Sequence, residues 1–67
     1  MKVKLNDVTF GTDLHDVLLT FLTIGKVYDV KKVDSDFECI MYIEDDNGDV
    51  ISIDLIEKEY LDWSIAQ

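Results

Sequence analysis

The hexapeptide EDDNGD places four carboxylates within six positions, between the apolar runs MYI and VISI. In it Asp45, Asn47 and Asp49 alternate like the first oxygen ligands of an EF-hand calcium loop. The rest of that loop needs glycine at its sixth position and glutamate at its twelfth, where this chain has Val50 and Ile56. We therefore expect a solvated hairpin turn, with calcium binding as the alternative.

The single thiol, Cys39, and the single imidazole, His15, could in principle form a nucleophile and its base. However, His15 lies on the polar side of a helical pattern, and Cys39 shares a face with Met41 in an expected strand, where a thiol is usually an inert apolar group. The sequence contains no glycine-rich phosphate loop and no Ser-His-Asp set. We expect a protein that is not an enzyme and has no cofactor or metal site; a small metal-dependent enzyme or sensor is the rival hypothesis.

The chain as a whole has room for one small domain, residues 1–67. A chain of this length buries only about 60% of the surface that its unfolded form exposes. Hydrophobic residues make up 48% of it, which favours a folded protein over a disordered acidic tail. The longest apolar run, residues 17–24, is far shorter than the roughly 20 residues that span a bilayer. With one cysteine and no recognisable secretory signal, the expected compartment is the cytoplasm.

Charge is unevenly distributed. Fifteen acidic residues oppose six lysines, with no arginine, and the net charge is −9. Residues 34–67 carry eleven of the acids and only one lysine, Lys58. Such a field repels nucleic acid and anionic lipid, and it attracts basic proteins or cations. Direct nucleic-acid binding and membrane binding are therefore not expected.

The first third of the chain predicts a strand and a helix. Val3 and Leu5 alternate with lysines, which indicates a short strand or a small hairpin. Residues 13–22 have apolar side chains at helical spacing, with Thr12 or Asp13 as the N-cap. The apolar positions of this expected helix are Leu14, Val17, Leu18, Phe21 and Leu22.

The remainder reads as strands. Residues 26–33 are rich in β-formers, residues 37–44 alternate an apolar face with a mixed one, and residues 49–55 do the same. The apolar face of the second of these is expected to hold Phe37, Cys39, Met41 and Ile43. Residues 60–66 fit either a strand after a tight turn at 57–59, which we prefer, or a helix.

Register decides the shape of the acidic corner, because a slip of one residue sends every side chain to the other face. A three-residue loop, Asp46-Asn47-Gly48, pairs Ile43 with Ile51, Met41 with Ile53 and Cys39 with Leu55, all on one apolar face. Asp45 to Gly48 would then form a type I turn, with Gly48 in the left-handed conformation.

The segment FLTIGKVYDV and the later Asp-Asn-Gly hairpin resemble a broad group of small phage and prophage proteins with an SH3-like barrel. The pattern of that group runs Leu-Thr-x-Gly-Lys-x-Tyr-x-Val, then a strand, the hairpin and another strand. The matching residues, within 22–55, are Leu22, Thr23, Gly25, Lys26, Tyr28, Val30, Asp46, Asn47 and Gly48. The resemblance implies a five-stranded barrel, a phage origin and a role in binding other proteins. We expect a mainly β fold, a small SH3-like barrel of about five strands with one short N-terminal helix. An α+β fold, with an antiparallel sheet packed on one or two helices, is the alternative.

An acidic row suggests the binding surface. Asp34, Asp36 and Glu38 recur at every second position, so in an extended chain they would project from one face in steps of roughly 6.6 Å and could imitate phosphates. The same face continues to Ile40, Tyr42 and Glu44, and across the hairpin to Val50, Ser52 and Asp54. Apolar residues within a charged rim are typical of a protein interface.

We therefore expect an acidic binding protein, phage-encoded and located in the host cytoplasm, that inhibits a basic, nucleic-acid-binding host protein by DNA mimicry. Carboxylates would steer the encounter before contact through Tyr42 and Ile40. The expected partner-binding residues are Asp34, Asp36, Glu38, Ile40, Tyr42, Glu44, Asp45, Asp46, Asp49 and Asp54. One alternative is an assembly module that self-associates as a homodimer. Another is that the acids serve only solubility and the mixed face packs against the helix at 13–22.

Overall fold

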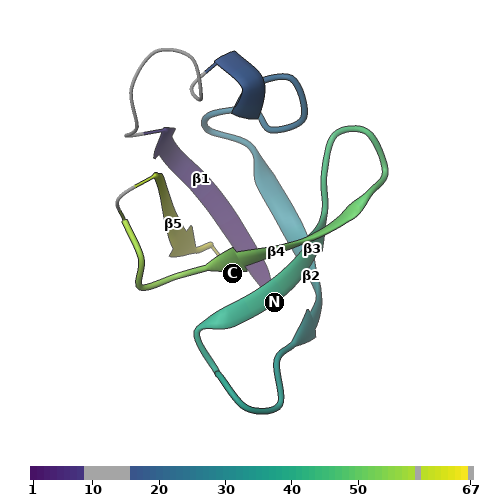
Figure 1. Ribbon diagram of the computed structural model, residues 1–67, viewed down its shortest axis with the longest axis vertical. Coiled ribbons are helices and arrows are strands. Elements are labelled where there is room, and N and C mark those ends of the chain that lie inside the picture. Colours follow the sequence, from purple (N-terminus) through teal and green to yellow (C-terminus); the bar gives the residue numbers. More distant parts are fainter. Residues whose placement is uncertain (9–15, 59, 67) are drawn as a thin grey trace.

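The computed structural model describes residues 1–8, 16–58 and 60–66. Within them, five strands form one antiparallel sheet in the order β4-β3-β2-β1-β5 (Figure 1). The strands are β1 (Lys2–Val8), β2 (Val27–Val33), β3 (Ile40–Glu44), β4 (Val50–Asp54) and β5 (Leu61–Ile65). The expectation of a mainly β fold is confirmed.

The sheet bends at β2, which belongs to both of its halves. Residues 27–29 pair with β1, whereas residues 30–33 pair with β3, and the register shifts between Val30 and Lys32. Such an irregularity bends a strand and increases its twist. As a result, the β3–β4 hairpin crosses in front of β1 in Figure 1, and both halves contribute side chains to one core.

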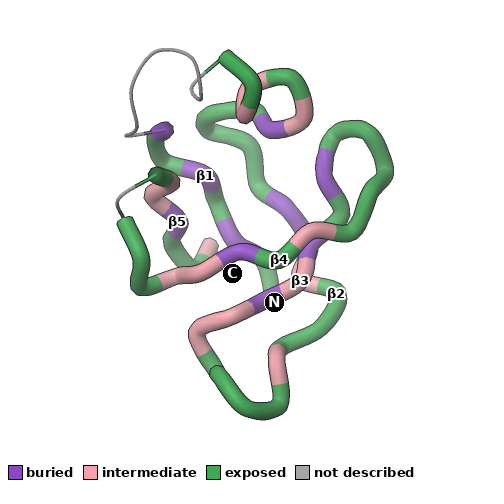
Figure 2. Tube along the Cα trace, in the orientation of Figure 1, coloured by how far each residue is buried: buried purple, intermediate pink, exposed green. Residues whose placement is uncertain are grey.

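The core follows the alternation of the strands. Val3 and Leu5 are fully buried in β1. Figure 2 shows buried segments alternating with exposed ones along this strand. The ring of Trp63 from β5 meets the ring of Tyr28 from β2 edge to face, with centroids 5.7 Å apart. The Trp63 indole Nε1 has no hydrogen-bond acceptor in the described part of the chain, so this ring is held by packing alone. The other core residues are Val8, Leu22, Met41, Ile43 and Ile53.

The β3–β4 hairpin has the predicted register. Met41 lies opposite Ile53 and Ile43 opposite Ile51, and the Leu55 amide donates to the Cys39 carbonyl at 3.0 Å. At the corner the Gly48 amide donates to the Asp45 carbonyl at 3.1 Å, and Gly48 has a φ of +87°. The three-residue loop with a left-handed glycine is therefore confirmed.

The two ends of the chain pair with each other through β1 and β5. The N-terminal segment is a single strand up to Val8, with an irregularity between Leu5 and Asp7, rather than a hairpin within the described residues. Residues 61–65 form a strand, as preferred, and the helical alternative for them is wrong. The tight turn predicted at 57–59 includes residue 59, which lies outside the described residues.

The helix predicted over residues 13–22 is not supported, and neither is an α+β fold. Residues 13–15 lie outside the described part, and beyond them only residues 16–18 are helical. Val17 is 56% exposed instead of facing the core. Local hydrogen bonds explain the difference, because the Val17 carbonyl accepts from the amide of Thr20 at 3.1 Å and from its hydroxyl at 2.6 Å, whereas an α-helix would pair it with the Phe21 amide. In the described residues no helix combines the length and apolar character that crossing a bilayer requires.

The predicted strand at 37–44 also begins later than expected, at Ile40. The carboxylate of Asp34 accepts hydrogen bonds from the amides of Asp36, at 2.8 Å, and Phe37, at 3.1 Å. An aspartate that bonds the backbone two residues ahead closes a turn. Residues 34–39 therefore form a loop, and the Phe37 side chain, expected in the core, is 64% exposed.

Candidate protein-binding site

The ten residues expected to bind a partner divide into two groups in the structure. Asp36, Glu38, Glu44 and Asp49 are exposed, and Ile40 and Tyr42 are half-buried on the outer face of the β3–β4 hairpin. The other four carboxylates each accept at least two hydrogen bonds from the protein itself; they are Asp34, Asp45, Asp46 and Asp54.

Asp46 is the most heavily used of these internal acceptors. Its Oδ1 accepts from Lys26 Nζ at 2.5 Å and from the Tyr28 hydroxyl at 3.0 Å, and its Oδ2 accepts from Thr23 Oγ1 at 2.6 Å. The hydrogen bond from Lys26, followed by that from Thr23, holds the pKa of Asp46 below its usual range. Because its amide also donates to the Phe21 carbonyl, Asp46 fastens the hairpin corner to residues 21–28, the segment that leads into β2.

The donors to Asp46 form a cluster of their own. Lys26 Nζ lies 5.0 Å from the centroid of the Tyr28 ring, in a cation–π arrangement. The pKa of Lys26 is raised, chiefly by its hydrogen bond to Asp46, and that of Tyr28 is raised chiefly by burial. The Tyr28 hydroxyl also accepts from the Thr23 amide at 2.8 Å. Thr23, Lys26 and Tyr28 are the polar residues of the Leu-Thr-x-Gly-Lys-x-Tyr segment, so in this chain that segment serves as a structural tie.

Asp45 closes the corner from inside. It is only 9% exposed, and its Oδ1 accepts from the amides of Asn47 and Asp49, both at 2.9 Å. Within residues 1–8, 16–58 and 60–66, no three carboxylate, thiol or imidazole groups gather where they could hold a metal ion. His15 lies outside the described residues, so its relation to Cys39 is not defined.

The phosphate-like row is absent. Asp34 turns its carboxylate toward its own loop, where Oδ2 accepts from the Tyr42 hydroxyl at 3.1 Å. The backbone hydrogen bonds from Asp36 and Phe37 lower the pKa of Asp34, and the bond to Asp34 raises the pKa of Tyr42. Because residues 34–39 are not extended, the spacing of 6.6 Å expected for Asp34, Asp36 and Glu38 does not apply.

The outer face of the hairpin is open. Val50 and Ser52 are exposed on β4, and register places Ser52 opposite Tyr42. On the other side of Tyr42 lies Lys32 of β2, whose Nζ is 6.0 Å from the ring centroid. Among the described residues of the segment at 13–22, Leu18, Leu19, Phe21 and Leu22 pack on the core and not on this face, contrary to the alternative in which the face packs against a helix.

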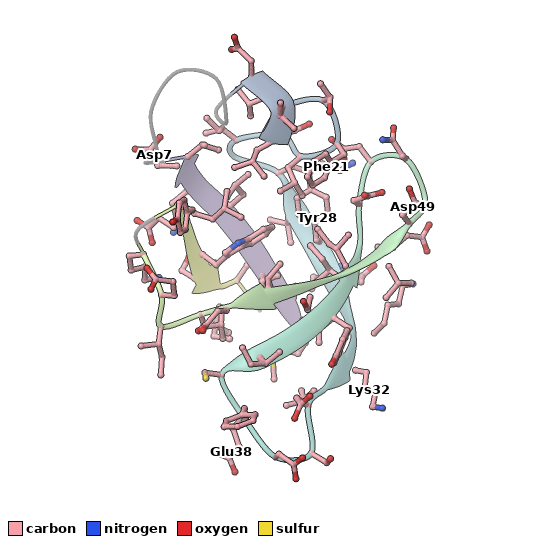
Figure 3. The ribbon with its side chains drawn as sticks, viewed as in Figure 1. Asp7, Phe21, Tyr28, Lys32, Glu38 and Asp49 are labelled. Carbon is pink, nitrogen blue, oxygen red and sulfur yellow. The ribbon has the colours of Figure 1, made fainter. Side chains whose placement is uncertain are left out.

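Exposed acids lie at both ends of this face. Figure 3 shows Glu38 below the hairpin and Asp49 at its far end. Glu44 lies between them, with its Oε2 3.8 Å from Lys31 Nζ, a long and exposed pair that leaves its charge available. Asp54 instead bonds the amides of Ile56 and Glu57 at the turn after β4.

Sequence reasoning missed Phe37 as a surface residue. It projects from the 34–39 loop between Asp36 and Glu38 and is among the most exposed large apolar side chains described. The spacing of Asp34 and Asp36 could have indicated a side-chain-closed turn, because aspartate favours such turns.

Comparison of the chain with protein-family models, with curated proteins and with solved structures found no match.

Proposed function

We propose that the protein is a non-enzymatic, phage-encoded binding module that engages a basic surface of a host protein and keeps nucleic acid from that surface. The observation that carries the proposal is the outer face of the β3–β4 hairpin. Tyr42 and Val50 remain accessible on it, while Glu44 and Asp49 frame it. Accessible apolar groups inside a charged frame favour a protein partner over a small ligand.

We also propose that the bent sheet curls into an SH3-like barrel, as the resemblance implies, with its seam left open between β4 and β5. The strand order, the bend at β2 and a hollow lined by side chains of both β4 and β5 support this. A barrel would place the 34–39 loop and the 45–49 corner at opposite ends of one exposed hairpin, where both could reach the same extended partner.

The electrostatic contribution is strongest at these two ends. Lys31 and Lys32 lie beside the middle of the face, near Glu44 and Tyr42, and partly offset the acids there. The net charge of −9 steers a basic partner over a distance set by ionic strength, about 10 Å at 0.1 M salt. Short-range contact through Phe37, Tyr42 and Val50 would follow.

The test is capture of host proteins from bacterial lysate on the immobilised chain at low and at high salt. We expect the captured proteins to be basic, to be released as salt rises, and to be displaced by added double-stranded DNA. A specific partner that stays bound at high salt and is not displaced by DNA would contradict the mimicry.

A matched variant separates function from solubility. Asp36→Asn, Glu38→Gln and Asp49→Asn together remove three exposed charges without touching an internal hydrogen bond made by those carboxylates in the described structure. We expect weaker capture and a shallower dependence on salt at unchanged stability. Unchanged capture would mean that these acids serve solubility only.

Self-association is the alternative function. The exposed apolar side chains of Phe37 and Val50 could support it, but a homodimer would bring two charges of −9 together. Sedimentation at several concentrations distinguishes the two: a monomer throughout favours the hetero-partner, and a concentration-dependent dimer favours assembly.

A further inference from the structure

The outer edge of β4 has backbone groups that no strand of the described chain pairs with. β4 is the last strand of the sheet, next to β3 only. The Leu55 amide bonds the Cys39 carbonyl and the Asp45 amide bonds the Asp49 carbonyl, so residues 49, 51, 53 and 55 point their backbone groups toward β3. The amides and carbonyls of Val50, Ser52 and Asp54 therefore point away from the sheet.

The other edge of the sheet, β5, is blocked. The Ala66 amide donates to the Lys2 carbonyl at 2.8 Å, so the even-numbered residues of β5 direct their backbone groups toward β1. The amides and carbonyls of Trp63 and Ile65 therefore point away from the sheet. The outward carbonyl of Trp63 accepts from Lys58 Nζ. Lys58 lies just before β5, and a charged side chain, most often lysine, placed over a sheet edge is a common protection against pairing with another chain. β4, with the sequence VISID, has no such residue.

A small apolar hollow lies next to the open edge. It is lined by β4, by β5 and by the turn between them, and has a volume of about 130 Å³. A dry cavity of about 150 Å³ accepts benzene, so this hollow is large enough for one apolar side chain. Its lining contains two acids and no lysine: Ser52, Ile53, Asp54, Glu57, Tyr60, Leu61 and Trp63.

We propose that β4 accepts an extended, basic segment of the partner protein as an additional strand, with one apolar side chain of that segment in the hollow. Strand addition draws affinity from main-chain hydrogen bonds and specificity from pockets for alternate side chains. The basic character of the segment follows from Asp49 and Asp54 at the two ends of the edge and from the net charge of −9, and it rests on the proposed function. A second copy of β4 is disfavoured as the occupant, because it would bring the same acids together.

The experiment uses two blocked seven-residue peptides of equal charge, one alternating lysine with leucine and the other alternating lysine with glycine. Amide exchange is followed by NMR, and Trp63, the single tryptophan, reports on the hollow by its fluorescence. We expect the leucine peptide to slow exchange of the Val50 and Ser52 amides roughly tenfold and to change the Trp63 emission. The glycine peptide should do neither.

Two variants test the backbone contact. Ser52→Pro removes an outward amide without removing a bond to β3, which is the position where a strand tolerates proline. We expect it to weaken binding of the leucine peptide roughly tenfold, whereas the matched Ser52→Thr should not. If Ser52→Pro does not fold, a leucine peptide N-methylated on the edge that faces β4 tests the same hydrogen bonds on the unaltered protein.

Each outcome has a definite meaning. Equal, salt-dependent binding of both peptides without protection of β4 would overturn strand addition and leave the electrostatic function standing. No binding of either peptide at millimolar concentration in low salt would count against both. Protection of the Val50 and Ser52 amides that rises with protein concentration alone would show that a second copy occupies the edge, and would overturn the proposal.

Discussion

The corner at residues 45–49 and the loop at residues 34–39 flank the same strand, β3, and both are rich in aspartate. In the corner, Asp46 binds three side chains from residues 23–28, which lead into β2, so the turn is fastened to a distant part of the chain. In the loop, Asp34 mainly bonds its own turn and Tyr42, and the tip with Phe37 is exposed. The comparison teaches that the role of a carboxylate depends on the donors that tertiary structure brings within reach. Local acidity does not distinguish the two turns.

The largest expected effect concerns the corner. Gly48→Val should lower the free energy of unfolding by about 2 kcal/mol, because a β-branched residue is strained at a φ of +87°. Space is not the cause, since a Cβ there would come no closer than 3.9 Å to Glu44 Oε1. Urea denaturation measures the loss. Gly48→Asn is the control and should lose less, because asparagine tolerates this conformation. A valine variant as stable as the parent would mean that the corner does not need glycine.

Asp46→Asn should follow, with a loss of about 1–2 kcal/mol, since charged hydrogen bonds to Lys26, Thr23 and Tyr28 are weakened or lost. The matched control is Asp49→Asn, which changes an exposed acid in the same corner and should stay within about 0.5 kcal/mol of the parent. If Asp46→Asn and Asp49→Asn lowered the free energy of unfolding equally, the hydrogen bonds of Asp46 would not contribute to stability beyond what an exposed carboxylate does.

The dependence on pH sharpens the same comparison. The pKa of Asp46 is lowered in the folded protein, mainly by its hydrogen bond from Lys26. The ionised Asp46 therefore contributes fully to the free energy of unfolding above its unfolded pKa of about 4, and this contribution is lost as the pH falls through the folded pKa. Urea denaturation between pH 7 and pH 2 should show stability falling at the acid end, and less steeply for Asp46→Asn. Asp34, whose pKa is also lowered, should contribute in the same direction. An identical slope for parent and Asp46→Asn would contradict the lowered pKa.

The smallest effect on stability is expected in the loop. Phe37→Ser should change the free energy of unfolding by no more than about 0.5 kcal/mol, because the ring is already exposed, yet it should weaken capture of the basic partner. Val17→Ser, at another exposed apolar position away from the hairpin, should change neither. If Phe37→Ser unfolds the protein, the loop is structural. If capture is unchanged, Phe37 is not part of the interface.

The sequence was sufficient to predict what short-range pattern controls. The alternation of Met41, Ile43, Ile51 and Ile53 and the turn chemistry of Gly48 together determined the hairpin and its register. The helix at 13–22 and the inward Phe37 were wrong because competing hydrogen bonds decided both places. At the first place the amide and hydroxyl of Thr20 bind the Val17 carbonyl, and at the second the Asp34 carboxylate binds amides of its own loop.

The candidate site was predicted only at the level of composition. Ile40, Tyr42 and Glu44 do lie on one open face. That Asp45 and Asp46 would bind groups of the protein itself depends on donors 18 to 23 residues away or on the backbone of a completed turn, and neither is visible in local spacing. The blocked β5 edge likewise depends on Lys58 reaching the Trp63 carbonyl.

The pairing of β1 with β5 has a consequence for how the protein is made. β3 and β4 are close in sequence and can pair as soon as both have been synthesised, whereas β1 gains its second neighbour only from residues 61–65. Contacts between distant parts of a chain form late, because the intervening segment must first be closed into a loop. During translation β1 therefore lacks its pairing with β5, and Val3 and Leu5 lack their contacts with that strand, until residues 61–65 have left the ribosome.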